Sequence, residues 1–150
     1  MGTAKDMNKK NVDQLNSFLR GEMSAVETYR LALEKLEPGS EARPQLQTCM
    51  SSHQERVRIL ESKIVELGGS PAEGSGAWGA FAKAVEGSAA VLGDKMAIDA
   101  LEAGEDHGLK DYRTDVTKLD ISVRQLVVSE LLPKQESTHR TMSTLKHQLH

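Results

Sequence analysis

The chain has 150 residues, 38% of them hydrophobic and 27% charged, and this composition predicts one globular domain large enough to bury a core. A formal net charge of -3, with one Trp, two Tyr and two Phe, argues against nucleic-acid binding, because such a chain supplies neither a basic surface nor a base-stacking platform. No apolar run approaches the ~20 residues that span a membrane, so no membrane partner is expected. The polar N-terminus and the single cysteine, which has no internal disulfide partner, favour a cytoplasmic protein.

The first predicted helix follows residues 1–10, which are expected to form a lead-in, and Asn11 or Asp13 is expected to cap it. Its apolar residues recur every three or four positions, and Glu22 is the one charged side chain within that stripe. The Pro-Gly-Ser turn at residues 38–40 ends the helix. Because a buried carboxylate is costly unless it is neutralised, Glu22 is a candidate functional residue.

A second helix is predicted over about residues 41–67, and the polar residue within its apolar stripe is His53. The Gly-Gly-Ser-Pro stretch at residues 68–71 ends it. Residues 68–93, rich in Gly, Ala and Ser, are expected to form a long crossover with one short helix at about 77–85. A connection of this length can run back along the bundle, so helices two and three are predicted to lie parallel. Trp78 and Phe81 are expected to anchor this crossover to the bundle. A small ligand bound beneath the crossover, stacked on Trp78, is a weaker alternative.

The third helix, predicted over about residues 94–118, repeats the first. The Gly-Glu and Tyr-Arg pairs of residues 21–30 recur 83 residues later, within 104–113, so Glu105 takes the place of Glu22. Gly104 and Gly108 suggest a close backbone approach or room for a bound group, because Gly inside a helix is destabilising. A fourth helix is predicted over about 121–149, kinked at Pro133.

Counting residues from the two short turns puts five titratable side chains near mid-height of the predicted bundle. They are Glu22, His53, Glu105 and the Glu-x-x-His pair Glu136 and His139. Mutual repulsion among three carboxylates and two imidazoles in one buried layer would raise their pKa values or force the side chains apart. A divalent cation bound among them would remove this repulsion. Such ligands suit iron, manganese or zinc. The alternative is a metal-free cluster neutralised by protons and by Arg30, Arg56 or Arg113.

These residues resemble the ferritin-like di-metal carboxylate bundles, in which two helices each supply a Glu and two each supply a Glu-x-x-His. Residues 21–29, GEMSAVETY, are similar to the first-helix ligand region of bacterioferritins. The Gly-Glu and Tyr repeat, His53 and the Gly-Gly-Ser-Pro stop more closely resemble a bacterial ferritin-like family recorded as a domain of unknown function, over about residues 12–149. The resemblance implies an all-α ferritin-like four-helix bundle, with residues 1–150 forming one domain and a long crossover between helices two and three.

The ligand set taken from the residues and the resemblance is Glu22, His53, Glu105, Glu136 and His139. The residues expected beside these ligands are Tyr29, Tyr112 and Arg56, with packing as the alternative for both tyrosines. Helix two departs from the family pattern, because the position three before His53 is Met50 instead of Glu. If the 83-residue offset of the repeat is applied to the second helix instead, His53 aligns with Glu136 and Arg56 aligns with His139. One ion, two ions or none are therefore all open.

The leading hypothesis is a bundle with a mid-height iron site, or a manganese one, that oxidises Fe(II) or handles oxygen or peroxide. The alternative is a metal-free bundle that acts as a structural or partner-binding module. Whether the chain is an enzyme stays open between the two. The resemblance also implies a homodimer.

Overall fold

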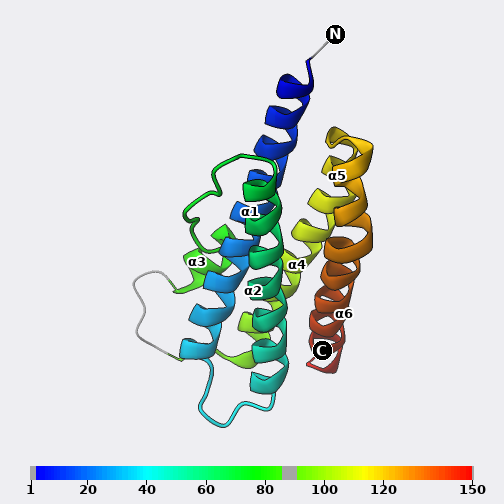
Figure 1. The fold of residues 1–150 in the computed structure, drawn as a ribbon. Coiled ribbons are helices and arrows are strands. Elements are labelled where there is room, and N and C mark those ends of the chain that lie inside the picture. The colour runs from blue at the N-terminus through cyan, green and yellow to red at the C-terminus, as the bar shows by residue number, and fades with distance from the viewer. Residues whose placement is uncertain (1–2, 86–90, 150) are drawn as a thin grey trace.

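The computed structural model describes residues 3–85 and 91–149, and every regular element within those ranges is helical. Four long helical segments form the predicted four-helix bundle, which confirms the all-α fold class (Figure 1). The long segments are α1 (Ala4–Lys35), α2 (Arg43–Glu66), α4 (Asp94–Asp115) and a last segment made of α5 (Ile121–Leu126), the π-helical turn η2 (Val127–Leu131) and α6 (Leu132–Gln148). The short elements are α3 (Gly79–Val85) in the crossover and the 3-10 turn η1 (Val116–Lys118).

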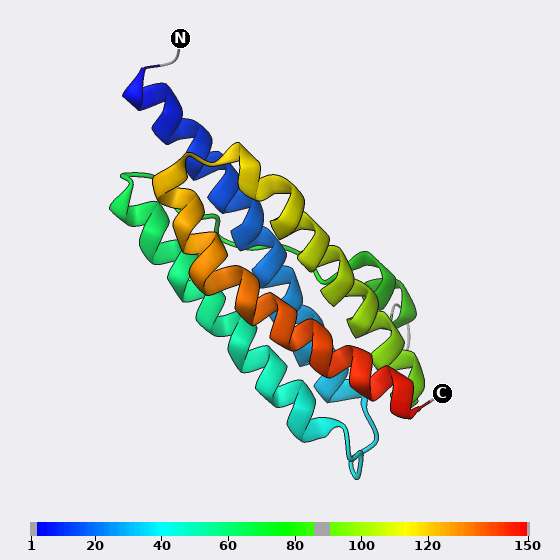
Figure 2. The ribbon, with the colours of Figure 1, turned by 90° about the vertical axis from the view of Figure 1, so that its right-hand side faces the viewer.

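The order of the helices around the bundle follows from the lengths of the connections. α1 packs against α2 and α4 against α6, as short turns require, while α1 also contacts α4 and α2 also contacts α6 (Figure 2). The long crossover returns the chain to the other end of the bundle, so α2 and α4 run parallel, as predicted (Figure 1). Within the described residues, no helix combines the length and the apolarity needed to cross a bilayer.

α1 starts earlier than the sequence pattern predicts. Thr3 forms a capping box with Asp6, so residues 4–10 are helical instead of an irregular lead-in. Asn11 is therefore not a cap but a buried mid-helix residue that bonds the opposite turn. Its Nδ2 donates to Asp120 Oδ2 at 2.9 Å, and its Oδ1 accepts from the Asp120 backbone N–H at 3.1 Å. These bonds tie α1 to the connection between α4 and α5.

The crossover lies along α1 and is held there by specific contacts. Gly68 ends α2 with a φ of 83°, a left-handed conformation that glycine adopts readily. Farther on, the Trp78 backbone N–H donates to Thr28 Oγ1 at 2.8 Å, and Phe81 of α3 is fully buried. The predicted anchoring role of Trp78 and Phe81 is confirmed.

Pro133 does not break the last helical segment. Instead, the preceding turn η2 is π-helical, and the Leu132 N–H bonds the Val127 carbonyl five residues back. A π-turn is a wider turn that takes up one extra residue, so it rotates everything that follows relative to a regular α-helix. This rotation decides which residues of α6 face the core.

Two apolar clusters fill the bundle, and they lie on either side of a band of polar side chains. One cluster includes Leu36, Leu46 and Ile98, and the other includes Leu15, Leu60 and Val127. Between them lie six buried polar residues from all four helical segments, which we call the polar layer: Glu22, His53, Arg56, Glu105, Gln135 and Thr138.

Candidate functional site

His53 lies at the centre of the polar layer and joins two carboxylates. Its Nδ1 is 3.0 Å from Glu22 Oε1, and its Nε2 is 2.7 Å from Glu105 Oε2. The imidazole is fully buried, and both glutamates are at most 4% exposed. The two glutamates of the sequence repeat therefore meet opposite edges of one ring.

Arg56, one turn after His53 on α2, is also fully buried within the layer. Its Nε is 3.1 Å from Glu22 Oε2. Its terminal nitrogens donate to Gln135 Oε1, to Thr138 Oγ1 at 3.1 Å and to Ser52 Oγ at 3.2 Å. One guanidinium thus neutralises the α1 carboxylate and joins α2 to α6.

Glu105 is hydrogen-bonded at both of its carboxylate oxygens. Its Oε2 accepts from the Tyr29 hydroxyl at 2.5 Å in addition to facing His53. Its Oε1 accepts from Gln135 Nε2 at 2.9 Å and from Thr138 Oγ1 at 2.7 Å. Both oxygens are satisfied by protein groups, which is what permits a carboxylate to be fully buried.

Within the polar layer, the pKa shifts of His53 and Glu105 both favour the charged form of the side chain. Burial lowers the pKa of His53, but the carboxylates of Glu105 and Glu22 raise it by more, so its net pKa shift is upward. Burial raises the pKa of Glu105, but the His53 imidazole and hydrogen bonds outweigh this effect and lower its pKa to about 2. An imidazolium and a guanidinium therefore balance two carboxylates, and the layer is neutral as a whole.

Tyr29 and Cys49 extend the layer towards one end of the bundle. Burial, followed by the Glu105 carboxylate, raises the pKa of Tyr29 well above its usual value. The same two causes raise the pKa of the Cys49 thiol to about 12. Both side chains stay protonated near neutral pH, so Cys49 has no thiolate character for nucleophilic chemistry.

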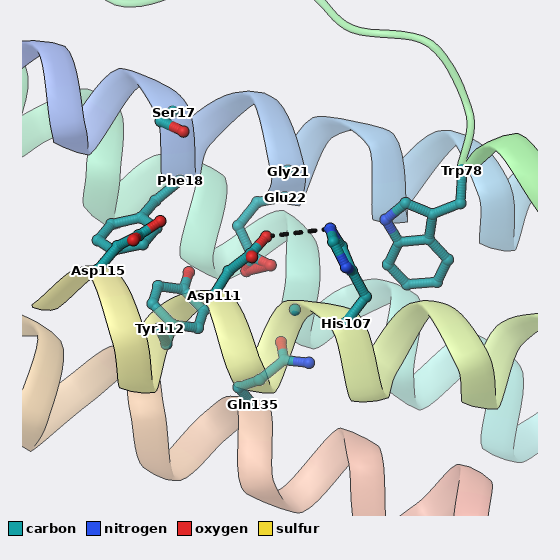
Figure 3. A pocket seen from close by; sticks show the side chains of 11 residues that line it. Ser17, Phe18, Gly21, Glu22, Trp78, His107, Asp111, Tyr112, Asp115 and Gln135 are labelled. Atoms are coloured by element: carbon teal, nitrogen blue, oxygen red, sulfur yellow. Dashed lines mark ion pairs between the residues drawn. The ribbon is translucent and has the colours of Figure 1, made fainter.

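The repeat is not symmetric at its second tyrosine. Tyr112 is 3% exposed and the Glu22 carboxylate lies close enough to raise its pKa, after burial as the larger cause. However, the Tyr112 hydroxyl lacks a hydrogen-bond partner among the described residues, whereas Glu22 Oε2 faces Arg56 Nε. The Tyr112 and Glu22 side chains line a cavity of about 40 Å³ between α1 and α4, which we call the α1–α4 cavity (Figure 3).

Glu136 and His139 lie outside the polar layer, which corrects the expectation that five titratable side chains meet at mid-height. The Glu136 side chain is 41% exposed and pairs with Arg113 at 3.4 Å. His139 is half-buried between α6 and α4, where its Nε2 is 3.4 Å from Glu102 Oε1. The role of both residues as metal ligands stays a prediction, but they cannot share one centre with Glu105 in this arrangement.

Gln135 and Thr138 occupy the places in the layer that the Glu-x-x-His pair was expected to take. In an uninterrupted α-helix, Lys134 would face the core seven positions after the buried Val127. The extra residue of the π-turn brings Gln135 inward instead. A signal was available in the sequence, because counting back four and seven positions from Met142 leads to Thr138 and Gln135.

Comparison with known proteins supports the fold and the family. The model of a family described as Domain of unknown function (DUF2383) matches residues 10–118. A crystal structure titled as ferritin-like, diiron-carboxylate proteins from Bacillus anthracis str. Ames matches with a TM-score of 0.71 and 20% identity, over 93% of this chain and 97% of that one. At this identity the likeness concerns the fold. The search of curated proteins gives no match.

The polar layer does not fit a dinuclear iron centre. Such a centre needs a Glu from each of two helices and a Glu-x-x-His from each of the other two. Here α2 places Arg56 in the layer and α6 places Gln135 and Thr138 there. Because the two carboxylates meet opposite ring nitrogens, one ion cannot contact His53 and both glutamates as they stand. Accordingly, residues 3–85 and 91–149 contain no group of three or more His, Cys, Asp or Glu side chains arranged to hold an ion.

Proposed function

We propose that this chain, which belongs to the DUF2383 family of domains of unknown function, acts as a structural or partner-binding module with the ferritin-like fold and not as a ferroxidase. The observation that carries the proposal is Arg56. A buried guanidinium holds the Glu22 carboxylate and the α6 side chains at the height where ferritin-like proteins hold metal. A cation entering there would meet a positive charge and carboxylates that are already paired.

The partner that the surface favours is a second copy of this chain, in the cytoplasm. A groove between α1 and α2, the α1–α2 groove, has a volume of about 320 Å³ and an apolar floor of Met23, Val26 and Val57. Glu27 from α1 and Arg58 from α2 lie at its rim. In a two-fold dimer every contact occurs twice, so each Glu27 can face the partner copy's Arg58.

The second candidate is an iron site, or a manganese or zinc site, that supports oxidation of Fe(II) or handling of oxygen or peroxide. It is favoured by the diiron-carboxylate neighbour and by the burial of Glu22, His53 and Glu105 in one layer. It requires these three side chains to leave their present partners. The chain is then an enzyme, whereas under the first proposal it is not.

Metal content separates the two candidates. The untagged protein is loaded anaerobically with Fe(II), Mn(II) or Zn(II), desalted, and measured by inductively coupled plasma mass spectrometry. We expect no stoichiometric metal, because the layer offers no complete ligand set. One or two ions per chain that are lost in Glu22→Ala/Glu105→Ala, but kept in the surface control His147→Ala, would overturn the proposal.

A designed variant tests the stated reason. Gln135→Glu/Thr138→His places a Glu-x-x-His on the inward face of α6, where the sequence has none. If this variant retains metal and the natural chain does not, the incomplete ligand set explains why the natural chain binds no metal. If neither protein retains metal, Arg56→Gln is added to the variant, since the proposal assigns the remaining obstacle to the guanidinium.

A further inference from the structure

The α1–α4 cavity is a second polar feature, distinct in its bonding from the closed layer beside it. It lies between α1 and α4, with Phe18 and Tyr112 on one side and Trp78 on the other (Figure 3). Gly21 and Gly108 also line it, and a Cβ added at Gly21 would meet no atom within 4 Å. The cavity therefore reaches from the buried Glu22 carboxylate to an exposed glycine on the surface of α1.

Two polar atoms at this cavity are not fully hydrogen-bonded by the described residues, and their side chains are only 3% and 4% exposed. The Tyr112 hydroxyl has no hydrogen-bond partner there, and Glu22 Oε2 has the Arg56 guanidinium on one side, at 3.1 Å. A buried polar atom without a hydrogen bond costs about 1–3 kcal/mol, so the unpartnered Tyr112 hydroxyl, facing a cavity that the Glu22 carboxylate also lines, indicates a hydrogen-bonding guest. Gln135, a third polar lining residue, already donates to Glu105.

Charge and size define the class of that guest. Two carboxylates around the cavity have a cationic partner, because Glu22 faces Arg56 at 3.1 Å and Asp115 faces Lys118 at 3.1 Å. Asp111 faces the exposed His107 ring at 3.3 Å. Because the buried carboxylate of the described lining, Glu22, is already paired with Arg56, it does not need a cation, and the guest is neutral. At ~10–15 Å³ per water centre, the cavity has room for about three water molecules.

We propose that the α1–α4 cavity binds a short chain of water molecules that hydrogen-bonds Tyr112 and Glu22 and connects the buried His53–Glu22 pair to solvent past Gly21. The other side of the layer is built differently, because there Tyr29 donates directly to Glu105 and Trp78 covers Gly104. Protons therefore reach the His53 ring through Glu22 and the cavity water. This inference depends on the His53–Glu22 contact and is independent of the proposed partner-binding role.

Two measurements test the proposal. A crystal structure of the natural chain at about 1.2 Å resolution or better should contain ordered water within hydrogen-bonding distance of both the Tyr112 hydroxyl and Glu22. In parallel, NMR measures exchange of the His53 ring N–H protons with water in Gly21→Val, which closes the mouth. Exchange should slow by about tenfold or more, because it must then wait for local opening of the bundle.

Arg20→Val is the matched control, since its side chain is exposed on the same helix and does not line the cavity. It should leave the exchange rate unchanged. A Tyr112 hydroxyl bonded directly to Glu22 with no water beside it would overturn the proposal. So would His53 exchange that is equally fast in Gly21→Val, because protons would then enter by another route.

Discussion

His53 and Glu105 make the free energy of unfolding depend on pH in opposite directions. The pKa of Glu105 is lowered to about 2, so its contribution is present above the unfolded value of 4.5 and is lost as pH falls towards 2. The pKa of His53 is raised, so its contribution is complete below the unfolded value of 6.5 and is lost as pH rises through the folded pKa. Stability should therefore be highest between these two unfolded values.

Replacing His53 should remove the fall in the free energy of unfolding that is expected as pH rises above 6.5. In His53→Gln we expect a lower stability at pH 5.5, but little further loss above pH 6.5, where the natural chain should lose up to about 1.4 kcal/mol per pH unit. Urea unfolding across the pH range measures both slopes. His107→Gln is the control, because the His107 side chain is 73% exposed. An unchanged slope in His53→Gln would assign the pH dependence to other groups.

At the scale of elements, the repeated Gly-Glu pairs of α1 and α4 differ in their surroundings. A Cβ at Gly21 meets nothing within 4 Å, whereas a Cβ at Gly104 would lie 2.0 Å from a ring carbon of Trp78. Gly21→Ala should stabilise the protein by about 0.5–1 kcal/mol through helix propensity. Gly104→Ala should instead destabilise it by about 1–3 kcal/mol, because the rigid indole must move.

Urea unfolding measures both changes, and Trp78 fluorescence reports whether the indole is displaced in Gly104→Ala. In a Trp78→Ala background the Gly104→Ala change should lose its cost, because the clashing ring is gone. If Gly104→Ala stabilises the natural chain as much as Gly21→Ala does, this result would contradict the close packing of Trp78 against Gly104 of α4.

At the scale of the whole molecule, the α1–α2 groove predicts a two-fold dimer in which Glu27 faces the partner copy's Arg58. Arg58→Glu should weaken the dimer by about tenfold in Kd, because it sets like charges against each other at two symmetric places. The double variant Glu27→Arg/Arg58→Glu should restore the affinity. Sedimentation equilibrium measures both Kd values.

The control for this experiment is Arg140→Glu, which makes the same charge change on α6, away from the groove. A natural chain that stays monomeric at high micromolar concentration would contradict the predicted dimer. A dimer that withstands Arg58→Glu would move the interface to another face of the bundle.

The sequence by itself determined the four helical segments, the long crossover, the parallel course of α2 and α4, and the burial of Glu22, His53 and Glu105. These features depend on local information, namely helical periodicity, helix-ending Gly and Pro residues, and connection length. Only the tertiary structure decided which side chains complete the polar layer around His53 and the two glutamates. A π-turn before Pro133 rotates α6 so that Gln135 and Thr138 face Glu105, and packing brings Arg56 against Glu22. Both depend on how helices distant in sequence satisfy one another's buried charges, which helical periodicity within one segment does not encode.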